Sequence, residues 1–297
     1  MAVALAVDIG GTKLAAGRVD DAGALAGVAT VPTPQSLDPE ALWGALAALV
    51  ASVTRGDEVV CGVGTGGPMT AGGEEVSPLN IPGWRGFPLR RRLAEATGLP
   101  VAVDNDAKAL ARGEGWVGAG RGARSFIAMV VSTGVGGGLV VDGRLLHGDA
   151  GNAGHIGHVI VEPEGRPCAC GGRGCLEAEA SGTGIRAATG RPPAEAPPEL
   201  VHHVGTCVGR AVASVANLCD LRLALVAGSV ALGFGEPFFA AAQAELDRRA
   251  RLDFSRGARI LPGGLGAGGP LVGAGAVGWR SLGHDAEPQR GGQAHDG

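Results

Sequence analysis

The feature that most constrains the fold of this chain is a unit of strand, glycine turn and strand that occurs twice. The first copy spans residues 4–20 and reads "ALAVDIGGTKLAAGRVD", where short apolar runs flank a glycine pair, as in a β-hairpin. The second spans residues 125–146 around "STGVGGG" and aligns with the first when Asp8 is set against Thr133. Because each copy opens about half of the chain, we predict a duplicated α/β protein with a cleft between its halves.

The segments around the hairpins alternate between helix and strand. We expect α/β domains at 1–117 and 118–283, and a disordered tail at 284–297, which lacks an apolar pattern. The last apolar helix is expected to pack back on the N-terminal domain. Helices are predicted at 38–53, 88–98, 107–115, 201–220, 235–252 and 268–282, and further strands at 59–67, 100–106 and from 221 into a third glycine turn.

Composition limits the classes of partner. The chain has 297 residues, of which 45% are hydrophobic and 18% charged, enough for the cores of two soluble domains. Its net charge of −4 gives no electrostatic basis for a nucleic-acid partner, and no apolar run approaches the ~20 residues of a membrane span. The opening "MAVALAV" lacks a basic start, so no signal peptide is expected. We expect a cytoplasmic protein without nucleic-acid or membrane partners, in a compartment where disulfides rarely persist.

Glycine turns between strands can hold phosphate, because backbone N–H groups approach an anion closely where no side chain intervenes. For either turn alone, a plain tight hairpin explains the residues equally well. The pair favours phosphate, because a hairpin does not require the acid, hydroxyl and lysine of "DIGGTK". The predicted nucleotide contacts are Asp8 (through water to Mg²⁺), Gly10, Gly11, Thr12 and Lys13 in the first turn, Thr133, Gly134, Gly136 and Gly137 in the second, and Gly228 and Ser229 in "AGSVALG".

The stretch "CACGGRGCLE" at 168–177 concentrates cysteines. Cys168, Cys170 and Cys175, with His158 ten residues upstream, make the Cys₃His ligand set of a closed tetrahedral Zn²⁺ site. The six cysteines of the chain also allow three disulfides, although a C-x-C pair is too close for easy bridging. The zinc interpretation is favoured, and the remaining cysteines are expected to be buried small hydrophobes: Cys61, Cys207 and Cys219.

Five motifs occur in an order that resembles the ROK family, a bacterial group of repressors, open reading frames and sugar kinases. They are "DIGGTK", "VDNDA", "STGVGGG", "GHIGH" and "CACGGRGCLE". The resemblance runs from about Val3 to Leu282. It implies an actin/hexokinase-like ATPase fold of two α/β domains, with ATP and a sugar bound in the interdomain cleft, and a zinc ion that holds the sugar-binding loop in place.

The resemblance also implies sugar-site residues. Asp106, preceded by Asn105, matches the family's catalytic Asn-Asp pair and would accept the proton of the attacking hydroxyl. A helix N-terminus explains the same residues, with Asp104 as the cap, and both roles are compatible because a helix N-terminus keeps a carboxylate ionised. The matching histidine, His158, binds zinc through one ring nitrogen and faces the sugar with the other. The predicted substrate contacts are Gly67, Asn80, Asn105, Asp106, His155, His158 and Glu177.

One position departs from the family pattern and leaves the substrate open. The family's Glu-x-Gly-His motif begins here with His155; an imidazole accepts one hydrogen bond and donates one, where a carboxylate accepts two. Some bacterial N-acetylmannosamine kinases that this chain resembles also carry "AGHIGH" and an "EAxASG" run. We predict an ATP-dependent kinase for the 6-hydroxyl of a hexose or N-acylhexosamine, with glucose and N-acetylmannosamine as candidates.

Two alternatives remain: a kinase for a sugar-like cyclitol, and a catalytically weak sugar sensor. Polyphosphate in place of ATP also stays open. A ROK transcriptional regulator is disfavoured, because the first predicted strand begins at Val3 and leaves no room for a preceding winged helix. By resemblance, the protein is expected to form a homodimer or homotetramer.

Overall fold

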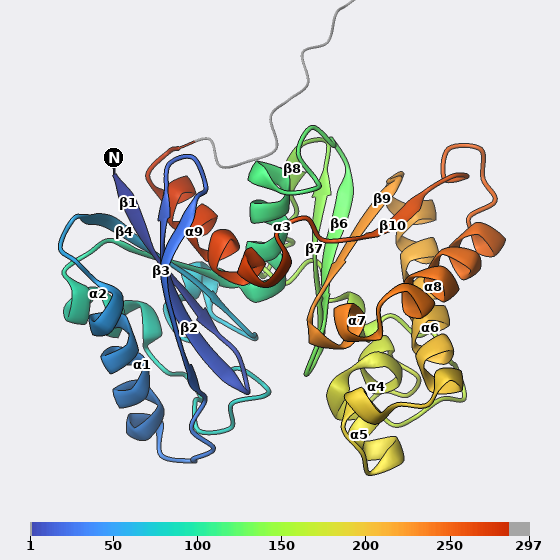
Figure 1. The fold of residues 1–297 in the computed structure, drawn as a ribbon, viewed down its shortest axis with the longest axis horizontal. Coiled ribbons are helices and arrows are strands. Elements are labelled where there is room, and N and C mark those ends of the chain that lie inside the picture. Colours follow the sequence, from blue (N-terminus) through green and yellow to red (C-terminus); the bar gives the residue numbers. More distant parts are fainter. Residues whose placement is uncertain (1, 285–297) are drawn as a thin grey trace, which may run out of the picture.

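The computed structural model describes residues 2–284, which form two five-stranded sheets of the same topology (Figure 1). The first sheet contains β1 (Val3–Ile9), β2 (Lys13–Asp20), β3 (Leu25–Pro32), β4 (Glu58–Thr65) and β5 (Val101–Asn105), in the order β3-β2-β1-β4-β5. The second contains β6 (Phe126–Val131), β7 (Val135–Val141), β8 (Arg144–Leu145), β9 (Leu223–Ala227) and β10 (Arg259–Pro262), in the order β8-β7-β6-β9-β10. The predicted mixed α/β class is confirmed. Of the predicted tail, residues 285–297 lie outside the described residues.

The two sheets also agree in strand direction. In each, the first three strands in sequence are antiparallel neighbours, the fourth runs parallel to the first, and the fifth runs parallel to the fourth. The register predicted between the two hairpins is wrong, however. The ladders close at Ile9 in the first hairpin and Val131 in the second, which sets Asp8 against Val130 rather than Thr133. Glycines recur so often around the second turn that residue type alone does not define the register.

Helices cover the outer face of each sheet (Figure 1). In the first half these are α1 (Pro39–Val53) and α2 (Leu89–Thr97), and in the second α6 (Pro198–Cys219) and α8 (Glu236–Arg249). Helix α1 begins as predicted, because the Asp38 side chain accepts the Glu40 N–H at 2.9 Å. The shorter helices are α4 (Leu176–Ala180), α5 (Gly182–Thr189) and α7 (Ser229–Phe234), with single 3₁₀ turns at Ala71–Gly73, Ile156–His158, Pro193–Glu195 and Gly266–Gly268.

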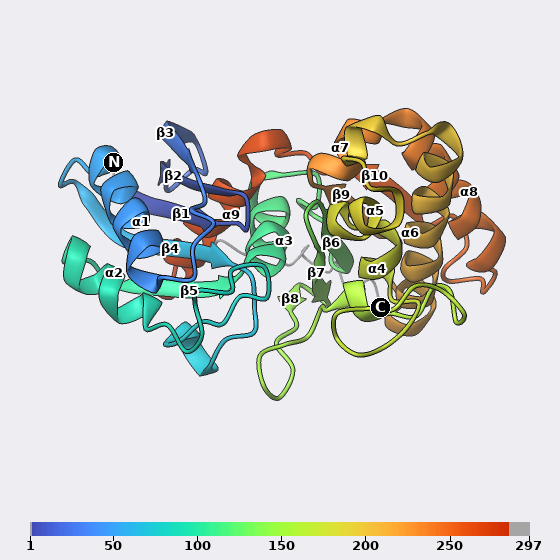
Figure 2. The same ribbon diagram turned by 90° about the horizontal axis from the view of Figure 1, so that it is seen from below.

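Two further helices, α3 (Asp106–Val117) and α9 (Gly269–Ser281), lie between the sheets (Figure 2). Helix α9 packs on β1 and β4 of the first sheet, and the Trp279 Nε1–H donates to the Val19 carbonyl at 3.2 Å. A Cβ on Gly62 of β4 would lie 1.9 Å from the Ala274 carbonyl oxygen. Glycine at this position therefore allows α9 to approach the sheet.

Helix α3 follows β5 of the first sheet in sequence but packs on β7 of the second. A Cβ on Gly138 would lie 2.6 Å from the Ala111 Cβ, and Leu110 joins the core of the second sheet beside Phe126. The predicted domain boundary between residues 117 and 118 stays a prediction. No helix within residues 2–284 is long and apolar enough to cross a membrane.

Candidate active site

The junction of β5 and α3 presents the predicted base. Asn105 caps α3, because its Oδ1 accepts the Ala107 N–H at 3.1 Å, and Asp106 is the first helical residue, with its Oδ1 2.8 Å from the same N–H. The prediction that Asp104 caps this helix is wrong. Its carboxylate accepts the Asn105 N–H at 2.9 Å and lies 3.6 Å from Arg112 Nε. The cap is therefore the neutral amide of Asn105, and the Asp106 carboxylate belongs to the first residue of the helix.

Asp106 lies among ionisable side chains from distant parts of the chain. Burial raises the pKa of Asp106 and Glu177 adds to the rise, whereas the hydrogen bond from the Ala107 N–H and the nearby His155 oppose it. Burial also lowers the pKa of His155 and so favours its neutral ring, whereas Asp106 and Glu177 oppose that shift. A carboxylate whose pKa is raised toward neutrality is a stronger base than an exposed aspartate. The structure thus brings together Asp106, His155 and Glu177, as the sequence predicted.

A second carboxylate, Asp8 of β1, lies close to Asp106. The two are neighbours across Gly64 of β4, whose Cβ would lie 3.6 Å from the Asp106 Cα and 3.9 Å from the Asp8 Oδ1. Burial raises the pKa of Asp8 to about 7, Asp106 adds to the rise, and Lys13 opposes it. Two carboxylates this close disfavour each other's charge, and a bound dication stabilises such a pair.

The first glycine turn is held by residues that the sequence analysis missed. Thr33 Oγ1–H donates to the Gly10 carbonyl at 2.7 Å, and Gln35 Nε2–H donates to the Gly11 carbonyl at 3.1 Å. No local signal links these residues to a turn more than twenty positions upstream. The predicted sugar contact Asn80 also meets this turn, since a Cβ on Gly11 would lie 2.9 Å from Asn80 Nδ2.

The second glycine turn meets Glu177. Glu177 Oε2 accepts the Val135 N–H at 2.9 Å, and a Cβ on Gly134 would lie 3.0 Å from the same oxygen. The Thr133 carbonyl accepts the Thr183 Oγ1–H at 2.9 Å, which ties the turn to α5. The predicted sugar-binding acid and the predicted phosphate turn are therefore adjacent.

Three glycines for which the sequence predicts nucleotide contacts do not lie in a turn between two strands. Gly136 and Gly137 lie within β7 rather than in the turn, and their Cβ atoms would lie 3.1 Å from the Ala107 Cβ of α3 and 3.0 Å from Ile156 Cγ2, respectively. Gly228, with φ of 101°, is followed directly by α7. The segment "AGSVALG" thus follows a strand and bends at Gly228, as predicted, and the bend leads into a helix rather than into another strand. Ser229 Oγ lies 2.9 Å from Ser132 Oγ, next to the second turn.

The four predicted zinc ligands form one cluster. His158 Nδ1 lies 3.9 Å from Cys168 Sγ, Cys170 Sγ lies 3.7 Å from Cys175 Sγ, and all four donor atoms are within 4.8 Å of one another. These separations match the edges of a tetrahedron around an ion with Zn–S bonds of about 2.3 Å. Burial raises the pKa of the Cys175 thiol to about 12 and so disfavours the thiolate. A bound dication would offset this effect, because it stabilises the deprotonated form of its ligands. The residues present therefore fit zinc.

All six cysteines lie in the described part of the chain, and each is a free thiol. Cys61 and Cys207 are buried, as predicted, whereas Cys219 is partly exposed. Cys207 forms a second group of metal-binding side chains with Glu162 and His203. Arg210 already pairs with the Glu162 carboxylate, so this second group is neutralised without an ion.

The cysteine loop also adjoins two predicted sugar contacts, His158 and Glu177. The Leu176 N–H donates to the Val159 carbonyl at 2.9 Å, which joins the end of the loop to the segment after His158. Helix α4 begins at Leu176, so Glu177 is in its first turn. The rings of His155 and His158 are 6.1 Å apart. A metal at the cluster would fix both segments at once.

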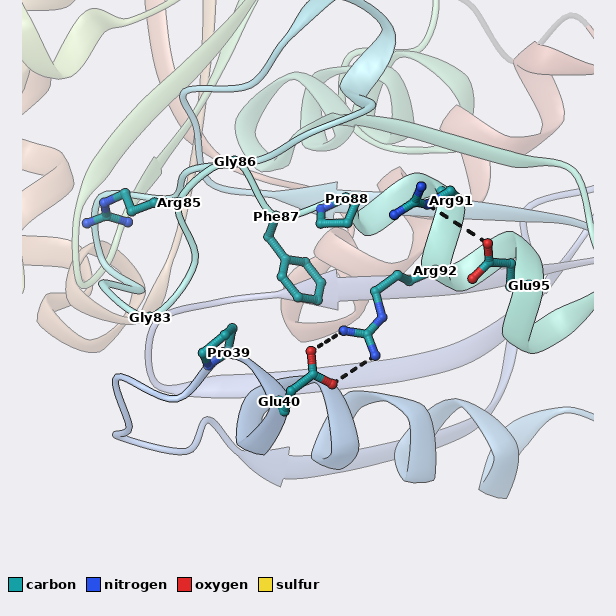
Figure 3. Close-up of a pocket in the computed structure, with 10 residues that line it drawn as sticks. All are labelled: Pro39, Glu40, Gly83, Arg85, Gly86, Phe87, Pro88, Arg91, Arg92 and Glu95. Carbon is teal, nitrogen blue, oxygen red and sulfur yellow. Dashed lines mark hydrogen bonds and ion pairs between the residues drawn. The ribbon is translucent and has the colours of Figure 1, made fainter.

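Two hollows lie outside this group of residues. One, of about 390 Å³, lies between α1 and α2, where Arg92 pairs with Glu40 and Arg91 lies 3.9 Å from Glu95 (Figure 3). The third arginine of its lining, Arg85, donates to backbone carbonyls, so each cation has a partner and we assign the hollow no ligand. The other, of about 160 Å³, borders the first glycine turn through residues 33–37 and Asn80.

A family model for ROK matches residues 4–278. The chain belongs to the ROK family. An N-acetylmannosamine kinase from Citrobacter koseri is 41% identical over 246 residues, which cover 78% of this chain and 84% of that protein. A ROK family glucokinase from Streptomyces griseus, in complex with glucose and AMPPNP, superimposes with a TM-score of 0.83 at 31% identity and covers 94% of this chain and 99% of that one. A ROK hexokinase from Thermus thermophilus gives a TM-score of 0.79 at 35% identity over the same shares.

These comparisons confirm the ROK resemblance and the actin/hexokinase-like ATPase fold. They concern sugar kinases whose lengths this ROK chain nearly spans. They do not assign roles to single residues, so the base, the nucleotide contacts and the zinc ligands belong to the proposal that follows.

Proposed function

We propose that this ROK protein is an ATP-dependent sugar kinase that phosphorylates the 6-hydroxyl of a hexose or N-acylhexosamine, with N-acetylmannosamine as its preferred substrate. The observation that carries the proposal is the half-buried Asp106 carboxylate at the N-terminus of α3, which shares its electrostatic surroundings with Asp8 beside the first glycine turn and with His155 and Glu177, the latter bonded to the second turn. The similarity to the Citrobacter koseri kinase supports the substrate.

Asp106 acts as the general base. As the γ-phosphoryl group arrives in line, the substrate hydroxyl loses its proton to the Asp106 carboxylate, whose pKa is raised by burial. Asn105 holds the start of α3 through its cap, and its amide lies near Gly67, whose Cβ would be 3.8 Å from Asn105 Nδ2. The base is therefore positioned by the helix rather than by a flexible loop.

The two glycine turns hold the nucleotide phosphates through backbone N–H groups, with Thr12, Lys13 and Thr133 beside them. Asp8 would hold Mg²⁺, since its carboxylate next to Asp106 provides the negative charge that such an ion prefers. The ion would neutralise charge that develops on the transferred phosphoryl group. Ser229 at the start of α7 lies near the adenosine end.

Zinc has a structural role in this proposal. His158 and the three cysteines hold it, and the closed ligand set leaves no position for substrate on the metal. His158 Nε2 and Glu177 then face the sugar. His155 offers one donor and one acceptor where a glutamate would offer acceptors alone, which suits a substrate with a different polar pattern from glucose.

The test measures ADP release with N-acetylmannosamine, N-acetylglucosamine, glucose, mannose and a set of cyclitols. We expect the highest kcat/KM with N-acetylmannosamine, and loss of activity in Asp106→Asn. The matched control is Asp142→Asn, since Asp142 is an exposed partner of Arg124 in the β7–β8 turn. A preference for glucose or a cyclitol would correct the substrate, and no ADP release with any of these compounds would favour a sugar sensor over a kinase.

A further inference from the structure

We propose that Lys108 and Arg112 of α3 are positioning residues that hold the loop carrying His155 and thereby determine the affinity for the sugar; this inference rests on the proposed function. The loop spans residues 146–155 and connects β8 to the 3₁₀ turn at Ile156–His158. The loop belongs to neither sheet, but it carries His155, whose ring interacts electrostatically with Asp106.

The loop has little apolar packing of its own. Residues 147–152 are exposed, and the loop closes on itself through the Ala153 N–H, which donates to the His147 carbonyl at 2.9 Å. The turn inside it is weaker, with the Gly151 N–H 3.3 Å from the Gly148 carbonyl. A segment of this kind needs contacts from outside to occupy one position.

Two long cationic side chains supply those contacts. Lys108 is only 1% exposed, and its Nζ donates to the Gly151 carbonyl. One helical turn further on, Arg112 Nη2 lies 3.4 Å from His147 Nε2, while its Nε lies 3.6 Å from the Asp104 carboxylate. Burial of a lysine is costly, and here it lowers the pKa of Lys108 while Asp104 opposes that shift. The Lys108 ammonium group is thus shielded from solvent at its contact with the loop.

The contacts of Lys108 and Arg112 connect the loop of residues 146–155 to the helix that carries the proposed base. Lys108 and Arg112 are four residues apart and so lie on the same face of α3, the helix that begins with Asp106. Further along the loop, Gly154 packs on β7, since its Cβ would lie 2.2 Å from the Gly137 carbonyl oxygen. The loop that carries His155 is therefore tied to α3 by Lys108 and Arg112 and to β7 by Gly154.

The test compares Lys108→Met, which removes the donor and keeps the length, with Lys108→Arg, which keeps charge and donors. For Lys108→Met we expect KM for N-acetylmannosamine to rise about tenfold, with KM for ATP unchanged, kcat within about threefold, and the unfolding temperature unchanged or higher. Lys108→Arg should restore most of the sugar affinity. The control is Arg124→Met, which removes a cation of an exposed pair and should change neither KM.

Hydrogen exchange of residues 147–155 provides a second readout that needs no turnover. Faster exchange in this loop for Lys108→Met, and not for Arg124→Met, supports the proposal even if the sugar assigned above is wrong. Unchanged exchange and unchanged sugar KM would overturn it. A parallel loss of stability, kcat and both KM values would also overturn it, because it would show a general structural role; if Lys108→Met does not fold, Lys108→Gln takes its place.

Discussion

Replacing Gly138 by alanine should slow the reaction without touching the substrate. A Cβ at this position in β7 would lie 2.6 Å from the Ala111 Cβ, 2.8 Å from the Ala107 carbonyl oxygen and 2.9 Å from the Lys108 Cα. Ordinary contacts of this kind lie at 3.4–4 Å. Two of the three atoms are helix backbone, so the conflict is relieved only when α3 moves away from the sheet, by about 1 Å.

That movement displaces the proposed base, because Asp106 is the first residue of α3. A misplacement of about 1 Å can cost on the order of 10² in rate, and overpacking of this kind destabilises by roughly 1–3 kcal/mol. We therefore expect kcat of Gly138→Ala to fall by about 10² while the protein remains folded at 25 °C. Steady-state ADP release and urea unfolding measure the two quantities.

Gly44→Ala is the matched control. Gly44 is in α1, and within residues 2–284 no atom beyond its chain neighbours and its own helix backbone lies within 4 Å of the position of its Cβ, so alanine should leave kcat unchanged and stabilise by about 0.5–1 kcal/mol. If Gly138→Ala keeps the wild-type kcat and the wild-type unfolding midpoint, α3 is not seated on β7 as described, and the position assigned to Asp106 is wrong.

Three further outcomes follow from the same structure. Because burial raises the pKa of Asp106, the native state keeps the Asp106 proton to higher pH than the unfolded chain does. The ionised carboxyl therefore destabilises the fold increasingly as pH rises above the ordinary pKa of an aspartate. Asp106→Asn should consequently unfold at a higher temperature than the wild type at pH 8, while kcat falls by about 10²–10⁴. Metal analysis should find one zinc per chain, lost in Cys170→Ser together with sugar affinity and retained in Cys219→Ser; zinc retention by Cys170→Ser would contradict the ligand set. Gly62→Ala should lower the urea midpoint by more than Gly138→Ala does, since its Cβ would meet α9 backbone at 1.9 Å; an unchanged midpoint would contradict the packing of α9.

Features encoded locally were predictable from the sequence. Helix α1 starts where Asp38 and Pro39 predict, and the two hairpins turn at Gly10-Gly11 and at Gly134 because short apolar strands flank these turns. The four predicted zinc ligands lie in one cluster, as their spacing and residue types indicate. Asp106 and Glu177 were named from motifs, and the structure places them in one electrostatic group.

Features that depend on distant contacts were not predictable. Asp104 reads as a helix cap, and nothing local indicates that it lies beside Arg112, eight residues later. Lys108 looks like part of a solvated helix face but is buried, because the loop after β8 covers it. The sequence of β7 does contain a usable signal. Gly136 and Gly138 are two residues apart and share one face of the strand, and glycines in such positions indicate that a helix approaches that face closely.

The central claim is that Asp106 accepts a proton from the 6-hydroxyl of a sugar as that oxygen takes the γ-phosphoryl group of ATP. It is tested most directly by following ³¹P spectra of ATP and N-acetylmannosamine with the wild type and with Asp106→Asn. We predict that the wild type converts the γ-phosphate signal into that of a phosphate ester on the 6-oxygen, and that Asp106→Asn shows no ester over the same time. An ester formed at comparable rates by both proteins, or a product phosphorylated at another hydroxyl, would contradict the account.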